Sequence, residues 1–388
     1  MGAERGTITS GTTLTLWVAA GARCEFRGCN RYLLEDGLTG YELNLAERAH
    51  VVGATEGARS PRGGAALEVA LRNEEENLML LCRDHHRLID TLVAEHAVGE
   101  LLAMKREHEK RIRLLTGLSA SSNTVVLRMI GGIRGAPVEV GREAVRRAVI
   151  ADGRYPDYRA ALAGEDVEID LRGLPAEADP TYWKSGEHMI VECSARLRGA
   201  QDAIPHLSVF ALARLPFLVA LGYHLDDKVS TTIYPRQRGG TGDGGWGYDP
   251  EATPKAFALR RLGGPGGPRV TLAVSLTAAI GAEVLSAASQ STVYEIEPDD
   301  AAHSRELFSA RGSLDAFAET YHDFLAALER DHPDCEAIDL YLAAPAPAAV
   351  QVGRGLMRDA HPALVVFDRG SDGLFHRTLA LGGSAASP

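Results

Sequence analysis

The segment ENLMLLCRDHHRLID, residues 76–90, sets a cysteine and two adjacent histidines directly behind a short apolar run. In the first turn of a helix, Cys82 and His85 lie three residues apart and share a face, whereas His86 is rotated from His85 by about 100°. The two neighbouring imidazole rings therefore cannot face the same partner. We expect His85 to join Cys82 in one site and His86 to belong to another.

A pair of cysteines stands upstream of this segment. Cys24 and Cys29 form a C-x4-C pair, and Cys82 and His85 form a C-x2-H pair that begins 53 residues later. Two close pairs separated by a long insert are the usual way in which four tetrahedral ligands reach one zinc ion. The pattern predicts a structural zinc site that adds folding energy to a small domain. The alternative is that these are ordinary buried cysteines.

The remaining composition limits the class of protein. Five cysteines, an odd number that includes Cys193 and Cys335, are spread over 388 residues, which suits a reducing compartment better than a disulfide framework. No apolar run has membrane-spanning length, and the first residues contain no apolar stretch of the kind found in signal peptides. We therefore expect a soluble, cytoplasmic protein of two or three domains.

The charge is unevenly distributed. The chain carries a net charge of -11, which argues against a generic basic nucleic-acid binder. Residues 1–118 hold 15 Lys and Arg against 17 Asp and Glu, a net charge of -2, so the rest of the chain carries -9. Several arginines of the first segment stand near its cysteines and histidines, where a local basic surface could contact phosphates.

Two further residues are candidate partners of His86 in a second site. ERAHVVG places His50 on an expected strand, and ENLMLL places Asn77 just before Cys82, so the chain reads His, Asn, His in order. CEFRGC, AHVVG, ENLMLLCRDHHRLID and KREHEKRI together resemble the HNH endonucleases of the ββα-metal type over roughly residues 14–117.

That resemblance implies an α+β nuclease domain in which His50 is the general base toward a water molecule. Asn77 would orient His50 or its loop, and His86 would help to hold one catalytic divalent metal, Mg or another, that stabilises the scissile phosphate. One position departs from the family pattern, because many members have an aspartate before the base where this chain has Ala49. The remaining metal ligands stay open, with Glu47, Asp84 and Asp90 as candidates. Arg62 could contact a phosphate or be only a solvated residue.

The pattern of apolar and polar residues changes in the rest of the chain. An apolar periodic pattern predicts a helix over residues 93–117, and the small polar residues 119–123 mark the end of a first domain, 1–118. We expect a bridging segment over 119–164 with a helix at 142–153, and a last domain over 165–388. There, buried strands are predicted at 188–193, 217–225, 269–277, 336–344 and 363–369, and helices at 304–331 and 348–360. The alternation favours an α/β domain with a largely parallel sheet.

Aromatic and cationic residues in the last domain are candidates for binding a nucleotide. Aromatic rings beside cations can stack on bases and neutralise phosphates, and a helix N-terminus can hold an anion. The candidates are Trp183 with Lys184, Tyr234 and Arg236 at the mouth of the glycine-rich loop 235–250, Trp246 and Tyr248 within that loop, and Arg354 in a helix after a proline-marked turn. The competing interpretation is that these aromatic rings fill a core and that GRG serves packing.

Residues 165–383 resemble the SAVED domain, a pair of fused Rossmann-like halves related to CARF sensors of cyclic oligonucleotides. The stretches that carry the resemblance are HLSVFALARLPFLVALGYHLDDK, the W-x-Y loop, AVSLTAAIGAEV and APAPAAVQVGRGLMRDAHPALVVFDR. An HNH nuclease joined to a SAVED sensor looks like the DNA-degrading effector of bacterial CBASS antiphage defence. The resemblance implies a partner cyclase, a cyclic di- or trinucleotide activator, a ligand-dependent homo-oligomer (dimer to tetramer), and double-stranded DNA as substrate.

Two other functions remain open. One is a constitutive HNH restriction-type nuclease whose C-terminal half recognises modified DNA, which a strong basic patch near Arg236 and Arg354 would favour. The other is a non-catalytic, zinc-stabilised binding module fused to a nucleotide sensor. The presence of His50, Asn77 and His86 together counts against a pure binding module, because such a module has no need of them.

Overall fold

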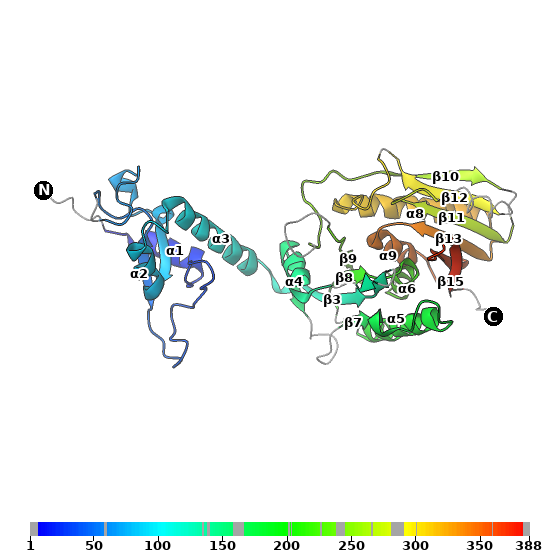
Figure 1. Ribbon diagram of the computed structural model, residues 1–388, viewed down its shortest axis with the longest axis horizontal. Coiled ribbons are helices and arrows are strands. Elements are labelled where there is room, and N and C mark those ends of the chain that lie inside the picture. The colour runs from blue at the N-terminus through cyan, green and yellow to red at the C-terminus, as the bar shows by residue number, and fades with distance from the viewer. Residues whose placement is uncertain are drawn as a thin grey trace. The chain divides into compact units, whose positions relative to one another are not determined.

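The computed structural model divides into two compact units, Met1–Ser119 and Ala120–Pro388 (Figure 1). It describes residues 7–57, 60–133, 136–137, 140–157, 167–200, 202, 204–225, 227–237, 245–264, 267–280, 291–299, 301–358 and 360–382. Among these residues, no helix combines the length and the apolar character that a membrane crossing requires.

The first unit is built on a two-stranded antiparallel sheet. Five consecutive buried residues form β2 (Leu78–Cys82), which pairs with β1 (Ala46–His50) so that His50 lies opposite Leu78. The chain passes directly from β2 into a helix, which gives the order strand, strand, helix. The helices are α1 (Ser10–Ala20), α2 (Arg83–Thr91) and α3 (Val98–Thr116), and short 3-10 turns cover Val69–Leu71 and Glu75–Asn77. Fully buried Leu78 to Leu81 form the centre of its apolar core together with Leu16 and Leu101.

The second unit contains two mainly parallel sheets that are separate from each other. In the first sheet, β3 (Asn123–Ile130) is central, and its neighbours all run parallel to it. The neighbouring strands are β6 (Tyr155–Asp157), β7 (Val167–Asp170) and β8 (Leu207–Leu212), with β9 (Thr231–Ile233) beyond β8. The associated helices are α4 (Arg142–Ala151), α5 (Tyr182–Gly199) and α6 (Leu215–Leu225). Small elements complete this half: β4 (Gly132–Ile133), β5 (Ala136–Pro137) and 3-10 turns at Ala120–Ser122 and Leu171–Gly173.

The second sheet has the order β10-β12-β11-β13-β14-β15. Its inner strands β11, β12, β13 and β14 are parallel, and its outer strands β10 and β15 are antiparallel to their neighbours. The strands are β10 (Phe257–Gly263), β11 (Arg269–Ser275), β12 (Thr292–Pro298), β13 (Ala337–Ala343), β14 (Ala363–Arg369) and β15 (Phe375–Leu381). The helices α8 (Arg311–Asp331) and α9 (Ala346–Arg354) belong to this half.

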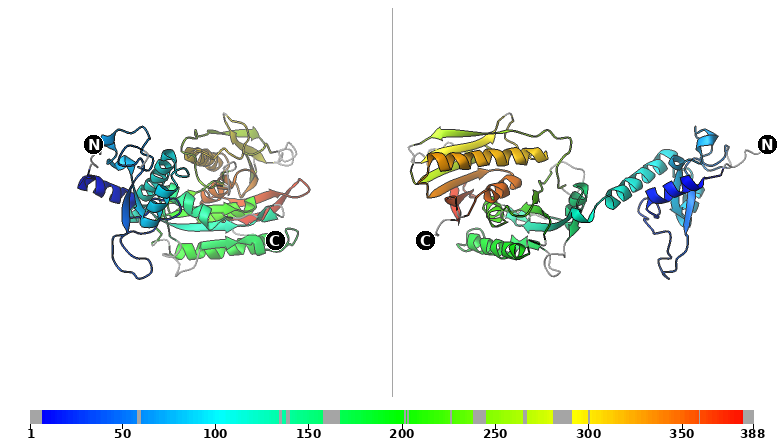
Figure 2. Two further views of the ribbon diagram at one scale, coloured as in Figure 1. Left: turned by 60° about the vertical axis from the view of Figure 1, so that its left-hand side comes forward. Right: turned by 180° about the vertical axis from the view of Figure 1, so that it is seen from behind.

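Helices α6 and α9 join the two halves. They lie between the two sheets in Figure 1 and in the right-hand view of Figure 2. They approach closely through two glycines: a Cβ atom at Gly222 would lie 1.9 Å from the Val350 carbonyl oxygen, and one at Gly353 would lie 1.9 Å from the Val219 carbonyl oxygen. The GRG of the sequence is therefore explained by backbone packing at its first glycine.

The predicted elements are partly confirmed. The strands expected at 269–277, 336–344 and 363–369 and the helices expected at 93–117, 142–153, 304–331 and 348–360 are present with shifted ends. The strands predicted at 188–193 and 217–225 are wrong, because these residues lie in α5 and α6. Residues 216–223 of α6 are all buried, so the helix has no polar face. A continuous apolar run of this kind does not distinguish a buried strand from a buried helix.

The structure also differs over the bridging segment. The sequence predicts that residues 119–164 connect two domains, but β3 from this stretch is the central strand of the first sheet and β6 is its neighbour. The second unit therefore begins at Ala120, directly after the small polar residues that end the first.

Candidate metal centre and active site

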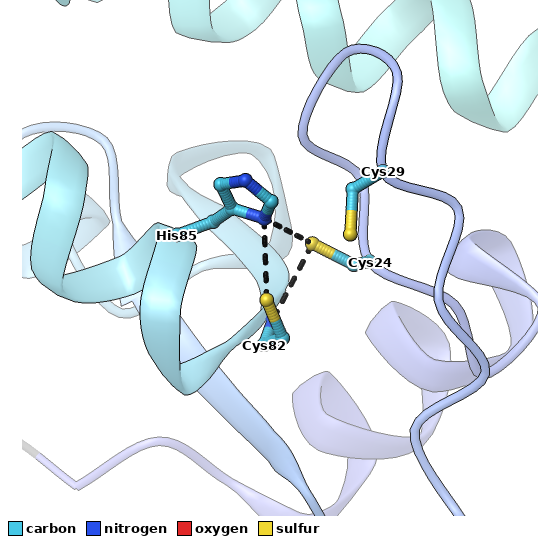
Figure 3. A group of neighbouring side chains, drawn as sticks. All are labelled: Cys24, Cys29, Cys82 and His85. Atoms are coloured by element: carbon cyan, nitrogen blue, oxygen red, sulfur yellow. Dashed lines mark hydrogen bonds between the residues drawn. The ribbon is translucent and has the colours of Figure 1, made fainter. Parts of the chain in front are cut away.

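The four residues of the predicted zinc site converge in the first unit. Cys24, Cys29, Cys82 and His85 each offer one ligand atom, and these atoms all lie within 4.8 Å of one another (Figure 3). The His85 Nδ1 atom lies 3.2 Å from Cys82 Sγ and 3.6 Å from Cys24 Sγ. Tetrahedral zinc with sulfur and nitrogen ligands places neighbouring ligand atoms about 3.3 to 3.8 Å apart. The geometry of the four side chains fits a zinc ion.

The surroundings of these ligands support the same interpretation. The backbone amide of Cys82 donates to Cys24 Sγ over 3.3 Å, and the Phe26 ring stacks on His85 with centroids 4.2 Å apart. Burial raises the pKa of the Cys24 thiol well above its usual range. A bound cation offsets such a cost because it stabilises the thiolate, which is the form that ligates metals.

Asn77 fixes the turn that follows His50. Its side-chain oxygen accepts from the Val52 amide over 2.8 Å, and its amide nitrogen donates to the carbonyl oxygens of Val52 and Arg72, both at 2.8 Å. The Asn77 carbonyl also accepts from the Val51 amide. The side chain of Asn77 is buried and makes no recorded contact with the imidazole of His50, so it acts on the loop rather than on the ring.

The His50 ring has a different partner, which the sequence does not indicate. Its Nε2 atom donates to the Asn73 side-chain oxygen over 2.9 Å. This hydrogen bond assigns the proton to Nε2 and leaves the lone pair on Nδ1. Asn73 stands in a polar run without any pattern that separates it from its neighbours.

His86 lies between two carboxylates. Its Nδ1 atom is 2.5 Å from Glu47 Oε2, and its Nε2 atom is 3.4 Å from Asp90 Oδ2. The hydrogen bonds that His86 donates to Asp90 and to Glu47 raise the pKa of its imidazole. Both carboxylates are among the metal ligands that the sequence leaves open, whereas the third candidate, Asp84, does not pair with His86 in the described part of the chain.

Arg62 is a structural residue. Its guanidinium donates to the carbonyl oxygens of Val51 (2.6 Å) and Ile89 (2.7 Å) and pairs with Asp90 at 2.9 Å. Its side chain is only 4% exposed, so the suggested phosphate contact is not available to it. Arg62 instead ties the end of β1 to α2, the two elements that carry His50 and His86.

The structure places His50, Asn77 and His86 in one small unit without bringing their side chains into contact. Consecutive residues of a strand point to opposite faces. Glu47 and Ala49 therefore share the face of β1 that meets His86, whereas His50 points to the other. A group that touches both His50 and His86 must lie beside the end of β1 rather than over one face of the sheet.

Two of the predicted nucleotide-binding aromatic residues belong to the core of the second unit. Tyr234 is 2% exposed, stacks on Phe210 with centroids 4.4 Å apart, and donates to Asp152 Oδ2 over 2.8 Å. Trp246 is 9% exposed and packs edge-on against Phe210. A bridge between Arg236 and Trp246 closes the ends of the glycine-rich loop. Neither ring offers a face to a base, which corrects the interpretation of these two residues.

The other candidates have mixed environments. Trp183 packs against the core beneath the Arg214 guanidinium, and Tyr248 donates to the Ile233 carbonyl over 2.5 Å. The Arg354 guanidinium donates to the Val229 carbonyl over 2.8 Å. Lys184 and Arg236 are exposed. Residues 238–244 of the loop lie outside the described part of the chain.

A polar hollow of about 360 Å³ lies elsewhere in the second unit, at the start of β3 and β6. Ser121, Ser122, Asp152, Gly153, Arg154 and Arg311 line it. The Arg311 guanidinium pairs with Asp152 and lies over the Tyr248 ring, with its central carbon 4.9 Å from the ring centroid. Sequence reasoning missed Arg154 and Arg311, because only the fold brings the two residues together.

A buried histidine beside this hollow makes stability depend on pH. His206 is 3% exposed and hydrogen-bonds Thr124 and Thr232. Burial, assisted by Arg154, lowers its pKa to about 4. The unfolded chain, with a histidine pKa near 6.5, therefore binds more protons than the folded chain between about pH 6.5 and 4, and stability falls as the pH falls through this window.

Because of His206, we expect the unfolding free energy to be about 2 kcal/mol lower at pH 5 than at pH 7.5. His206→Gln should flatten the pH dependence by that amount. Urea unfolding at both pH values, followed by tryptophan fluorescence, measures it, with Trp183 and Trp246 reporting on the second unit and Trp17 on the first. An unchanged slope in the variant would show that His206 is not responsible.

Each half of the second unit has a mainly parallel sheet with associated helices, which makes this unit an α/β domain. Residues 192–381 match the family model described as the SMODS-associated and fused to various effectors sensor domain, abbreviated SAVED. Over these residues the second unit is similar to the SAVED sensor domains.

The solved structures that match this chain are distant in sequence. The Acinetobacter baumannii Cap4 SAVED/CARF-domain containing receptor with the cyclic trinucleotide 3'3'3'-cAAA is 13% identical, with a TM-score of 0.42 over 78% of this chain and 61% of that one. The Moraxella osloensis Cap4 receptor is 11% identical, with a TM-score of 0.38 over 77% and 60%. This chain thus covers about three fifths of the length of those receptors. A comparison with curated protein sequences found no match.

Proposed function

We propose that this protein is a nuclease effector of antiphage defence, which a cyclic di- or trinucleotide activates to degrade double-stranded DNA. The observation that carries the proposal is the presence, on one chain with a SAVED sensor domain, of a strand-strand-helix unit with a convergent Cys/His set. The resemblance of that unit to HNH endonucleases supplies the reaction, hydrolysis of a phosphodiester.

The residues of the first unit have distinct parts in this proposal. His50, with its lone pair on Nδ1, takes the proton from the attacking water molecule. Asn77 holds the loop after His50, and Cys24, Cys29, Cys82 and His85 hold a structural zinc. His86 binds a catalytic divalent metal such as magnesium, which when bound would stabilise charge on the scissile phosphate and the leaving oxygen.

Activation requires a difference in affinity. A cyclic nucleotide made by a partner cyclase shifts the chain toward an active homo-oligomer only if it binds that assembled state more tightly than the idle one. Arg154 and Arg311, which line the polar hollow of the second unit, are our candidate phosphate contacts, and Arg311 would exchange its pairing with Asp152 for a phosphate.

One assay tests the proposal. Plasmid DNA is incubated with magnesium or manganese and the full chain, with and without a panel of cyclic di- and trinucleotides, for the parent and for His50→Ala. We expect cleavage only with one or a few of the ligands, and none with His50→Ala. Cleavage without any ligand would indicate a constitutive nuclease instead, and its absence under every condition would indicate a binding module. Light scattering with the active ligand measures the oligomer.

A further inference from the structure

The absence of an acidic residue before His50 leaves the proposed catalytic metal without its expected carboxylate. Position 49 is an alanine that is fully buried. A metal held by His86 alone, with water at every other position, would be bound weakly, because hard divalent cations such as magnesium are usually fixed by one or two carboxylates. A carboxylate from another position would complete the site.

Glu47 supplies a carboxylate on the correct face. Residues 47 and 49 of β1 are two apart and so point to the same side of the strand. The Glu47 Oε2 atom lies 2.5 Å from His86 Nδ1, and the two side chains are 42% and 26% exposed. Two ligand atoms of an octahedral cation at 2.0 to 2.1 Å lie about 3 Å apart. An outward shift of a few tenths of an ångström would therefore admit a cation between them.

Asp90 orients the His86 ring from its other side. Asp90 Oδ2 faces His86 Nε2 at 3.4 Å, while Asp90 Oδ1 accepts from the Arg62 guanidinium at 2.9 Å. Arg62 is anchored by the Val51 and Ile89 carbonyl oxygens. A carboxylate that accepts from one ring nitrogen fixes the tautomer and leaves the other nitrogen free for a metal.

We propose that Glu47 and His86 Nδ1 are the protein ligands of the catalytic divalent cation, and that Asp90, held by Arg62, is the positioning residue behind His86. This inference rests on the proposed nuclease function and adds the ligand set to it. Glu47 takes the part that an aspartate at position 49 would have, so the departure from the family pattern is compensated two residues earlier on the same strand face.

Metal binding by the zinc-loaded full chain tests the ligand set without relying on cleavage. Mn²⁺ is titrated and followed by electron paramagnetic resonance, with zinc content and far-ultraviolet circular dichroism as checks that each variant is folded. We expect Glu47→Gln to weaken Mn²⁺ binding by about 100-fold or more, and Asp90→Asn by about 10- to 100-fold. Glu47→Asp, which keeps the charge on a shorter side chain, should fall between the parent and Glu47→Gln. The exposed Glu56 gives the matched control, Glu56→Gln, which should bind as the parent does.

The outcomes separate this inference from the function on which it rests. If the parent binds Mn²⁺ and cleaves DNA but Glu47→Gln keeps the parental affinity, the ligand set is wrong and the nuclease stands. If the parent neither binds Mn²⁺ nor cleaves DNA with any cyclic nucleotide, both proposals are overturned.

Discussion

Replacing His85 with alanine is expected to unfold the first unit, whereas replacing the adjacent His86 is expected to leave it folded, zinc-loaded and inactive. The His85 ring lies within ligand distance of Cys24 and Cys82, while His86 faces Glu47 and Asp90 on another side of α2. A structural zinc contributes about 10 to 16 kcal/mol of apparent binding energy in small zinc domains, which is as large as the whole stability of a typical domain. The loss of one of four ligands therefore removes a large share of what holds this unit together.

The measurement is zinc content by mass spectrometry together with thermal unfolding of the purified full chain. The parent and His86→Ala should each carry one zinc per chain, and His85→Ala should carry less and lose the unfolding transition of the first unit. Cys335→Ser, in the second unit and outside the set, is the matched control and should keep its zinc. If the two histidine variants lose zinc alike, the division of α2 between two metals is wrong.

The sequence predicts the convergence of these four side chains for a physical reason. Metal ligands need particular side chains at particular spacings, and the residues Cys24, Cys29, Cys82 and His85 carry that information in their types and order. The prediction does not depend on knowing which of these residues are buried, because three cysteines and a histidine at this spacing in one small domain are typical of a zinc site. The division between His85 and His86 follows in the same way from the angle between neighbouring residues of a helix.

The predictions from the sequence are wrong where the burial of a residue determines its structure or its role. Tyr234 lies at the mouth of the glycine-rich loop and Trp246 lies within it, so the sequence predicts both at a surface, but both rings pack on Phe210 beside the first sheet. Helix α6 reads as a strand because it is surrounded by apolar neighbours and has no polar face. Its packing on α9 depends on Gly222 and Gly353, which are 131 residues apart in the sequence and meet only in the fold. The sequence does not predict the positions of Asn73, Arg154 and Arg311 either, because only the fold brings each of them to its partners.

The second large effect is expected at His50. His50→Ala should reduce ligand-activated DNA cleavage by about 100- to 10,000-fold, the range for loss of a general base. Its one recorded side-chain contact is the hydrogen bond to Asn73, which contributes about 1 kcal/mol to stability. The variant should therefore fold, keep its zinc and bind Mn²⁺ as the parent does.

Asn77→Ala separates a role in the loop from a role in the chemistry. Asn77 is 5% exposed, and its loss leaves buried backbone groups at Val52 and Arg72 without partners, each worth about 1 to 3 kcal/mol. We expect it to lower the unfolding free energy of the first unit and the cleavage rate together, whereas His50→Ala lowers the rate alone. Cleavage rates and urea unfolding curves of both variants, with His188→Ala in the second unit as the control, measure the difference. If His50→Ala cleaves DNA within about tenfold of the parental rate, His50 is not the base.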